Sequence, residues 1–347
     1  MPSSNLPSWL RGASRGLALL AVTAAGAALA PAAQAAPTVL STELRAVPVA
    51  AWADTVVWSS YDAATNDYHL VVSRNGAAPQ RLPVSPSANA FDVSLGTNRN
   101  GSTYAVYSRC TTPGTNTQPP TGCDLYRLSV PTGVETKLDK LSSPTWDERE
   151  PAIYRGTIAF IRRETHGGMT KDVLRTGSTV SGARGTTALV SVPLAAGSLS
   201  DTALSFNRVA YIRADRRGAT RDVHVRSLHT GGSDKRVYRA RSGGANFANI
   251  AGLSVGDTGA SFIWARTNEG SGTGNRLTRY TVSSGRLTYA LGSSRWTSSA
   301  WANQALGAAV MVDGSGTGTC FGNVNDPPQA TKCSVQLTGP VAFTARP

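Results

Sequence analysis

The chain of 347 residues has little of what most enzymes and metal proteins display. It has four histidines and four cysteines, and neither HExxH nor CxxC occurs, so the common zinc-hydrolase and thiol-redox patterns are absent. Neither of the two GSGTG segments, 270–274 and 314–318, continues into Lys-Ser/Thr and a helix, which excludes a P-loop. Charged residues make up only 16%, and no amphipathic helical period of useful length follows the N-terminal segment. We therefore expect no helix, no metal site and no cofactor.

The N-terminal segment has the layout of a cleavable signal peptide. Arg11 and Arg15 precede a short run of small apolar residues, 17–30, and Ala33-Gln34-Ala35 has the small-x-small pattern of a cleavage site. The run is too short and too rich in alanine for a membrane span, and no cysteine near the cleavage point offers a lipid anchor. We expect residues 1–35 to be a signal peptide and 36–347 to be an exported domain, secreted or associated with the cell wall.

The cysteines form two pairs with equal spacing. Cys110 and Cys123 enclose a polar loop rich in proline and threonine, and Cys320 and Cys333 enclose another of the same length. Zinc sites use closer spacing or nearby histidines, whereas an exported protein forms disulfides by default. The sequence predicts the disulfides Cys110–Cys123 and Cys320–Cys333, each worth about 3 kcal/mol in the chain-entropy model.

The chain repeats a short apolar pattern six times. Segments that end on or near an aromatic or apolar residue recur every 47 to 54 positions, at 55–60, 103–108, 157–162, 208–213, 260–265 and 307–312. A second strand follows each, and in four copies it opens with Asp, at positions 67, 124, 172 and 222. A Gly-containing turn then precedes a third strand, with glycines at 76, 133, 177, 231, 285 and 339. An inner strand before the apolar segment, such as 91–96 or 250–255, would complete a four-stranded unit.

Six antiparallel units of about fifty residues predict an all-β fold, a single six-bladed β-propeller over 36–347. No unit can bury both of its faces alone, so neighbouring units must stack around an axis. Each cysteine pair falls where the first strand of a copy ends and the second begins, in copies two and six. This placement supports the repeat and the disulfides together.

Two segments carry a resemblance to a known family. PAIYRGTIAFIRR, 151–163, resembles the TolB-like and WD40-like propeller repeat, in which Pro, a turn with Gly and an IAF-type strand follow one another. Segment 91–109 has the same layout, although the SPDG turn of that repeat is absent from every copy. The resemblance implies a six-bladed architecture and a binding role. It does not extend to the partners of the Tol system, because there is no room here for TolB's separate α/β domain.

Acidic residues and histidines offer few catalytic candidates. The densest acidic group is Asp147, Glu148 and Glu150, just before the third apolar segment. At a propeller's mouth such acids could form a glycosidase or lyase pair, but a solvated loop balanced by Arg149 is the simpler interpretation. The histidines, at 69, 166, 224 and 229, show no catalytic spacing, and we expect surface or inter-blade roles for His69 and His224. No catalytic residue is assigned.

Basic residues are concentrated in copies three and four. Residues 151–241 hold 16 basic and 6 acidic residues, and 14 of the basic ones are arginines, whose guanidinium groups suit carboxylate and phosphate. Arg213, Arg216, Arg217 and Arg221 are close together in the sequence. They predict an anion-binding face for an acidic cell-wall polymer, an anionic surface or an acidic protein. Nucleic acid is disfavoured, because aromatic residues do not alternate with this cluster. The alternative is that the arginines are scattered and serve solubility.

The sequence therefore predicts a secreted, non-enzymatic binding or scaffold protein. The main alternative is a secreted carbohydrate-active enzyme, a hydrolase or lyase with carboxylates at the mouth of the propeller tunnel. A surface protein with no small ligand is a third.

Overall fold

A computed structural model describes the backbone of residues 38–45, 47–114, 119–179, 185–205, 207–217, 219–229, 232–243, 246–255, 261–267, 276–281, 285–288, 297–303, 307–313 and 333–338. Contacts divide the chain into residues 1–34 and 35–347. The expected signal peptide lies outside the described residues. In the part of the chain that is described, every regular element is a strand, and no helix there is long and apolar enough to cross a membrane.

The first three blades are separate four-stranded antiparallel sheets whose strands follow the chain order. Blade 1 consists of β2 (Val49–Trp52), β3 (Thr55–Asp62), β4 (Asp67–Arg74) and β5 (Gln80–Arg81). Blade 2 consists of β6 (Ser94–Thr97), β7 (Thr103–Thr112), β8 (Thr121–Ser129) and β9 (Glu135–Lys137). Blade 3 consists of β10 (Asp147–Tyr154), β11 (Thr157–His166), β12 (Met169–Ser178) and β13 (Thr187–Pro193).

The next eight strands form one continuous sheet that we divide into two blades. Blade 4 consists of β14 (Gly197–Ser205), β15 (Arg208–Asp215), β16 (Thr220–Ser227) and β17 (Asp234–Gly243). Blade 5 consists of β18 (Asn246–Val255), β19 (Ser261–Thr267), β20 (Arg276–Thr281) and β21 (Gly285–Thr288). Only the pairs Ser242–Phe247 and Gly243–Asn246 join β17 to β18, so the connection is a short hairpin between two blades.

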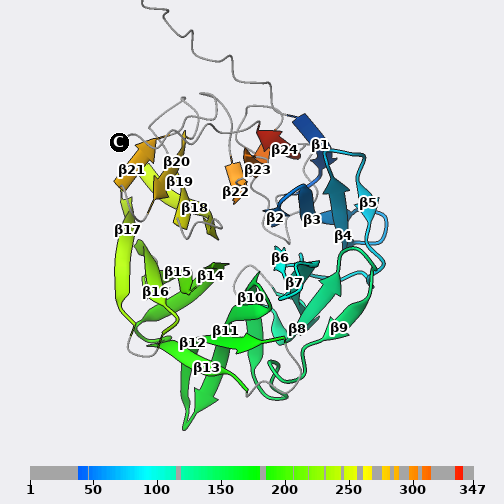
Figure 1. The fold of residues 1–347 in the computed structure, drawn as a ribbon. Helices are drawn as coiled ribbons and strands as arrows, with labels where there is room; N and C mark the ends of the chain where they lie inside the picture. Colours follow the sequence, from blue (N-terminus) through cyan, green and yellow to red (C-terminus); the bar gives the residue numbers. More distant parts are fainter. Residues whose placement is uncertain are drawn as a thin grey trace, which may run out of the picture. The chain divides into compact units, whose positions relative to one another are not determined.

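The last blade is assembled from both ends of the chain. Blade 6 has the order β1-β24-β23-β22, with β22 (Thr297–Asn303), β23 (Gly307–Asp313), β24 (Cys333–Thr338) and the N-terminal β1 (Thr38–Glu43). The innermost strands contact one another in the order β2, β6, β10, β14, β18, β22 and back to β2, which closes a ring (Figure 1). The fold is a β-propeller.

The N-terminal strand is the outermost strand of blade 6, and the sequence did not indicate this. β1 pairs with β24 in antiparallel register, with Glu43 opposite Cys333. Glu43 is buried and accepts hydrogen bonds from Trp58 Nε1 (2.7 Å), Ser60 Oγ (2.8 Å) and Ser41 Oγ (2.8 Å). Burial raises the pKa of the Glu43 carboxyl. Because Trp58 and Ser60 belong to β3, this carboxyl also ties the closing strand to blade 1.

The recurring apolar segments form the second strand of each blade, as the repeat predicts. In blades 1 to 4 these strands are rich in β-branched and aromatic residues, and their aromatic side chains Trp58, Tyr107, Phe160 and Tyr211 are fully buried. The proposed inner strands at 91–96 and 250–255 correspond to β6 and β18, which begin at Ser94 and Asn246. One expected turn is wrong: Gly177 lies inside β12 opposite Ile158. A Cβ there would lie 2.3 Å from the end of the Leu141 side chain, so a larger residue would displace Leu141.

The disulfide prediction is confirmed in blade 2. Cys110 on β7 and Cys123 on β8 are cross-strand partners and are bonded to each other. Cys333 is also disulfide-bonded. Its expected partner, Cys320, lies outside the described residues.

Candidate functional site

Three carboxyls lie on or just before the inner strands of successive blades. In blades 3 and 4 the register of the inner strand shifts between Arg149 and Ala152 and between Ser200 and Thr202. Glu150 and Asp201 lie in these bulges with left-handed backbone, at φ values of 52° and 51°. In blade 2, Asp92 lies just before β6. A left-handed backbone is uncommon for residues other than glycine and is often found at functional sites.

Hydrogen bonds link these carboxyls from blade to blade. Asp92 accepts from the Ser108 N–H (2.6 Å), from Ser108 Oγ (2.6 Å) and from the Glu150 N–H (2.6 Å) of blade 3. Thr202 Oγ1 of blade 4 donates to the Glu150 carbonyl. The Asp201 carboxyl in turn accepts from the backbone N–H of Leu253 in blade 5. Asp92 and Asp201 therefore hold neighbouring blades together.

Glu150 differs from its two neighbours in having no such structural role for its carboxyl. No hydrogen bond to that carboxyl is found among the described residues. Burial, followed by the negative charges of Asp92 and Asp201, raises the pKa of Glu150 to about 8. Burial also raises the pKa values of Asp92 and Asp201. The cluster therefore retains protons near neutral pH, and Glu150 can donate a hydrogen bond or a proton.

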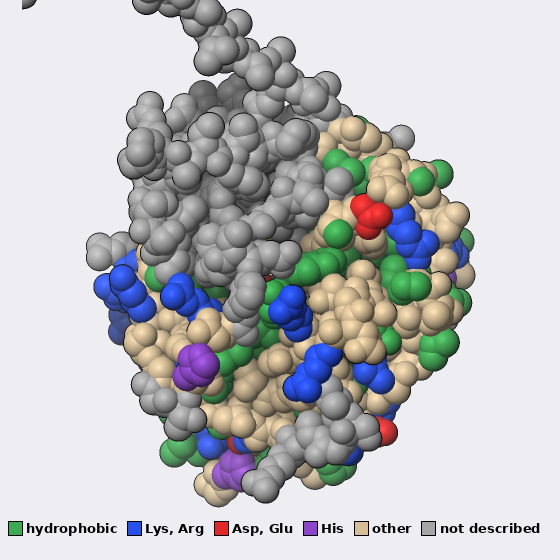
Figure 2. Space-filling model, in the orientation of Figure 1, with side chains coloured by type: hydrophobic (Ala, Val, Ile, Leu, Met, Phe, Trp, Pro, Cys, Tyr) green, Lys and Arg blue, Asp and Glu red, His purple; other side chains and the backbone are tan. Residues whose placement is uncertain are grey.

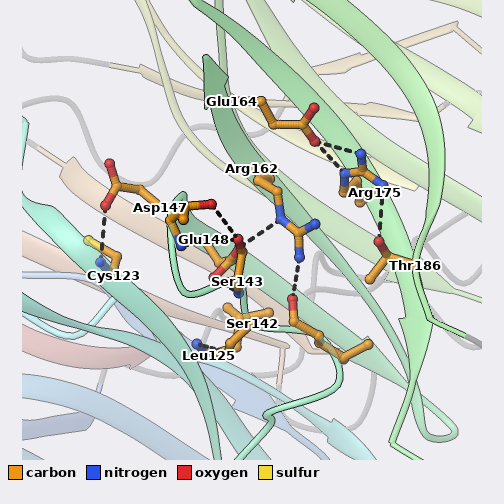
Figure 3. A network of polar contacts seen from close by, with 12 residues as sticks. Cys123, Leu125, Ser142, Ser143, Asp147, Glu148, Arg162, Glu164, Arg175 and Thr186 are labelled. Atoms are coloured by element: carbon orange, nitrogen blue, oxygen red, sulfur yellow. Dashed lines mark hydrogen bonds and ion pairs between the residues drawn. The ribbon is translucent and has the colours of Figure 1, made fainter. Parts of the chain in front are cut away.

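The other two acids of the 147–150 group are structural, as Figure 3 shows. Asp147 Oδ1 accepts from the backbone N–H groups of Gly122 (2.6 Å) and Cys123 (3.1 Å) and so connects blade 3 to blade 2. Glu148 is fully buried and pairs with Arg162, with 2.6 Å between Glu148 Oε1 and Arg162 Nε. Burial raises the pKa of Glu148 to about 7, against the opposing effect of Arg162. The expected solvated loop is therefore an ordered and partly buried strand.

No local pattern connects Asp92 or Asp201 with Glu150, because they are more than fifty residues from it in the sequence. The available signal was partial: Glu150 and Asp201 each lie 7 residues before the apolar segment of their copy, whereas Asp92 lies 11 residues before its own. Within the described residues, no group of three His, Cys, Asp or Glu side chains could hold a metal ion.

Three histidines have carboxylate neighbours that sequence spacing did not reveal. His69 lies 3.1 Å from Asp67, His166 lies 3.2 Å from Glu164, and His224 lies 3.2 Å from Asp234. They are located on or at the end of β4, β11 and β16, away from the innermost strands. The fourth, His229, lies 3.1 Å from Asn207 Nδ2. None of these pairs is part of the inner-strand carboxyl cluster.

The four arginines of the predicted anion-binding face surround the β15–β16 hairpin. Arg213 lies on β15, Arg216 and Arg217 lie in the turn, and Arg221 lies on β16; all four are exposed. Arg213 is opposite Asp222 and Arg221 is opposite Ala214, so Arg213 and Arg221 project from opposite faces of the sheet. The hairpin thus presents a cationic rim rather than one flat patch.

The arginines of blade 3 are in a different electrostatic environment. Arg149 and Arg163 both contact the fully buried Asp172, at 2.9 Å and 3.0 Å. Arg162 pairs with Glu148, and Arg175 pairs with Glu164 at 2.6 Å (Figure 3). In the described part of the chain no ion pair is found for Arg213, Arg216 or Arg217. Four arginines of blade 3 are therefore paired with carboxylates, whereas three arginines of the blade 4 hairpin have no ion pair in the described part of the chain.

The charged side chains are distributed unevenly over the surface. On the face shown in Figure 2, Lys and Arg side chains occur at several separate places, and acidic side chains are few. The β15–β16 hairpin is therefore one of several cationic sites.

Comparisons with known proteins give a fold likeness only. A scan against protein-family models finds no match, and no curated protein matches significantly in sequence. The chain is similar to the acylaminoacyl peptidase of Pyrococcus horikoshii at 9% identity and TM-score 0.45, covering 77% of this chain and 48% of that one. It is similar to the β-propeller domain of the trilobed protease of Pyrococcus furiosus at 6% identity and TM-score 0.43, covering 75% and 73%.

A third similar structure is a Hadza microbial sialidase, at 11% identity and TM-score 0.46, covering 80% of this chain and 63% of the sialidase. The chain spans about half the length of the peptidase. At these identities and scores, the likenesses say nothing about what the chain binds or does.

Proposed function

We propose that this protein is an exported, non-enzymatic binding protein that recognises an acidic polymer of the cell surface through the β15–β16 hairpin. The observation that carries the proposal is the contrast between the two blades richest in arginine. Arg149, Arg162, Arg163 and Arg175 are neutralised by buried carboxylates, whereas Arg213, Arg216 and Arg217 are exposed and have no ion pair among the described residues.

The shape of the hairpin fits an extended ligand. Arg216 and Arg217 lie at the tip, and Arg213 and Arg221 lie behind it on the two faces of the sheet. An acidic chain that crosses the tip would contact guanidinium groups on both sides, each of which can hold a carboxylate or phosphate with two hydrogen bonds. Because the groups are exposed, the attraction will be screened by salt over about 10 Å at 0.1 M ionic strength.

Export and family are also part of this proposal. The signal-like segment 1–35 supports export, and the disulfide between Cys110 and Cys123 suits an oxidising compartment. The layout of 151–163 supports a TolB-like repeat, a type of propeller that implies binding rather than catalysis.

The test is co-sedimentation of the mature protein with isolated acidic cell-wall material over a salt series. One variant has the four hairpin arginines changed to Ser. A control variant loses the same number of exposed positive charges elsewhere, at Arg81, Arg99, Lys140 and Arg155. We expect salt-sensitive binding that the hairpin variant loses and the control keeps. Equal loss of binding in both variants would mean that binding depends only on net charge and not on the hairpin. Absence of binding by the wild type would refute the proposal.

A second candidate function is supported by Glu150. A carboxyl that is protonated near neutral pH, beside two further carboxyls, has the attributes of a general acid acting on a polysaccharide. The release of reducing ends from cell-wall polysaccharide would measure this activity. Glu150→Gln should abolish the release and leave co-sedimentation intact, whereas the hairpin variant should show the reverse.

A further inference from the structure

A polar hollow lies between blade 2 and the segment that leads into blade 3. Its volume is about 660 Å³, within the range of pockets that hold small molecules, roughly 300 to 1,000 Å³. One wall comes from the strand ends that the Cys110–Cys123 disulfide joins and from β9. The other wall is the 139–147 segment. The hollow is on a different blade from the arginine hairpin and does not include Glu150.

The hollow contains one large aromatic side chain among polar groups. Trp146 is half-buried, and no hydrogen bond from its indole N–H is found within the described part of the chain. The Arg162 guanidinium lies 5.7 Å from the centre of the indole, and the His166 ring packs edge-on at 4.9 Å. These contacts fix the orientation of the ring, while its N–H remains available to a ligand.

The buried ion pair beneath the hollow fixes the 139–147 segment. Arg162 donates to the Leu141 carbonyl at 2.6 Å, and Glu148 Oε2 accepts from the Ser143 N–H at 3.1 Å, as seen in Figure 3. Asp147 connects the same segment to the opposite wall through Gly122 and Cys123. Both walls are therefore held in place before a ligand arrives, which reduces the entropy cost of binding.

The polar groups of the hollow include both hydrogen-bond donors and acceptors. Asp124 and Lys137 form an ion pair at 2.7 Å, and the hydroxyls of Ser143 and Thr145 are 3.3 Å apart. Ser142, Asp139 and further threonines complete the lining. A sugar ring has the matching chemistry, because hydroxyls surround its edge and C–H groups form an apolar face. The hollow contains more carboxylates than lysines, so it disfavours an acidic sugar.

We propose that this hollow is a binding site for a neutral saccharide, with one pyranose ring packed on Trp146 and its hydroxyls bonded to Asp139, Asp124 and the serine and threonine hydroxyls. The site is independent of the anionic ligand proposed for the hairpin.

The test is a titration of the mature protein with maltotriose, cellotriose and tri-N-acetylchitotriose, with binding measured by saturation-transfer NMR. Trigalacturonic acid serves as the acidic comparison. We expect at least one neutral trisaccharide to bind with a Kd below about 1 mM, and the acidic one to bind about tenfold more weakly or not at all. Trp146→Ala should weaken the neutral ligand about tenfold, and Asp139→Asn should weaken it several-fold.

Met169→Ala, at an exposed apolar residue outside the lining, is the matched control and should bind as the wild type does. A cooperative urea-unfolding transition, followed by tryptophan fluorescence, will show that a variant is folded. If Trp146→Ala does not fold, Trp146→Leu, which has no aromatic ring, and the exposed Asp139→Asn test the same contacts. The proposal is overturned if no neutral trisaccharide binds up to about 10 mM, if folded Trp146 and Asp139 variants bind normally, or if trigalacturonic acid binds more tightly.

Discussion

Replacement of Glu150 by glutamine should make the protein more stable in alkaline solution. The pKa of this carboxyl is about 8 in the folded protein and 4.5 in the absence of the fold. The folded state therefore binds the proton more tightly than the unfolded state does. The stability that comes from this proton is complete below about pH 4.5 and is lost as the pH rises towards 8. A glutamine side chain at this position would resemble the protonated acid in shape and would not ionise.

The size of the effect follows from the same values. A rise in pKa from 4.5 to about 8 corresponds to at most about 5 kcal/mol of unfolding free energy. The protons shared with Asp92 and Asp201 reduce this value, so we expect Glu150→Gln to gain about 1–3 kcal/mol at pH 9 and little at pH 5. Between pH 5 and pH 9, the unfolding free energy of Glu150→Gln should change less with pH than that of the wild type.

Urea unfolding at pH 5, 7 and 9, followed by tryptophan fluorescence with disulfides intact, measures this difference. Asp54→Asn, at an exposed acid in the turn between β2 and β3, removes a negative charge from the surface and should leave the pH profile unchanged. If Glu150→Gln is no more stable than the wild type at pH 9, or if its profile is equally steep, the proposed charge cluster is wrong.

Three further outcomes are expected. Arg162→Met should cost about 3–5 kcal/mol in urea unfolding because it leaves Glu148 buried without its cation, and a double variant with Glu148→Leu should recover most of the loss. Peptide mapping without reduction should recover Cys333 linked to Cys320; a link to blade 2 would contradict the blade register. Glu43→Leu removes the hydrogen bonds that fasten β1 to blade 1. Relative to the wild type, amide hydrogen exchange should become faster in β1 and β24, and should change less in blades 2 and 3.

Local sequence was enough to predict the blades. The buried second strands are runs of β-branched and aromatic residues, and the polar hairpins between them are visible without any knowledge of distant contacts. The same holds for Cys110 and Cys123, because their spacing places them opposite each other across a hairpin. Pairing between neighbouring segments is therefore predictable here.

Contacts between distant segments were not predictable. The pairing of β1 with β24 has no local signal, since a short strand at each end of the chain fits many partners. The cluster of Asp92, Glu150 and Asp201 depends on bulges that place Glu150 and Asp201 out of register on β10 and β14, next to Asp92 in the segment before β6. Spacing in one copy cannot show this, and alignment of the copies on their apolar segments matches only Glu150 with Asp201.

The closure of blade 6 by β1 has a consequence for how the protein reaches its native state. Thr42 pairs with Ser334, so the two partners are almost the whole chain apart in sequence. Contacts between such distant residues form slowly, although the entropy cost of loop closure grows only with the logarithm of loop length. Until it forms, β24 is an unprotected edge that another chain could pair with. Under the export that we propose, the N-terminus crosses the membrane first, and β1 would stay unpaired outside the cell until the last strand had crossed. The final folding step would then occur only in chains that were translocated to the end, and incomplete chains would remain open to proteolysis.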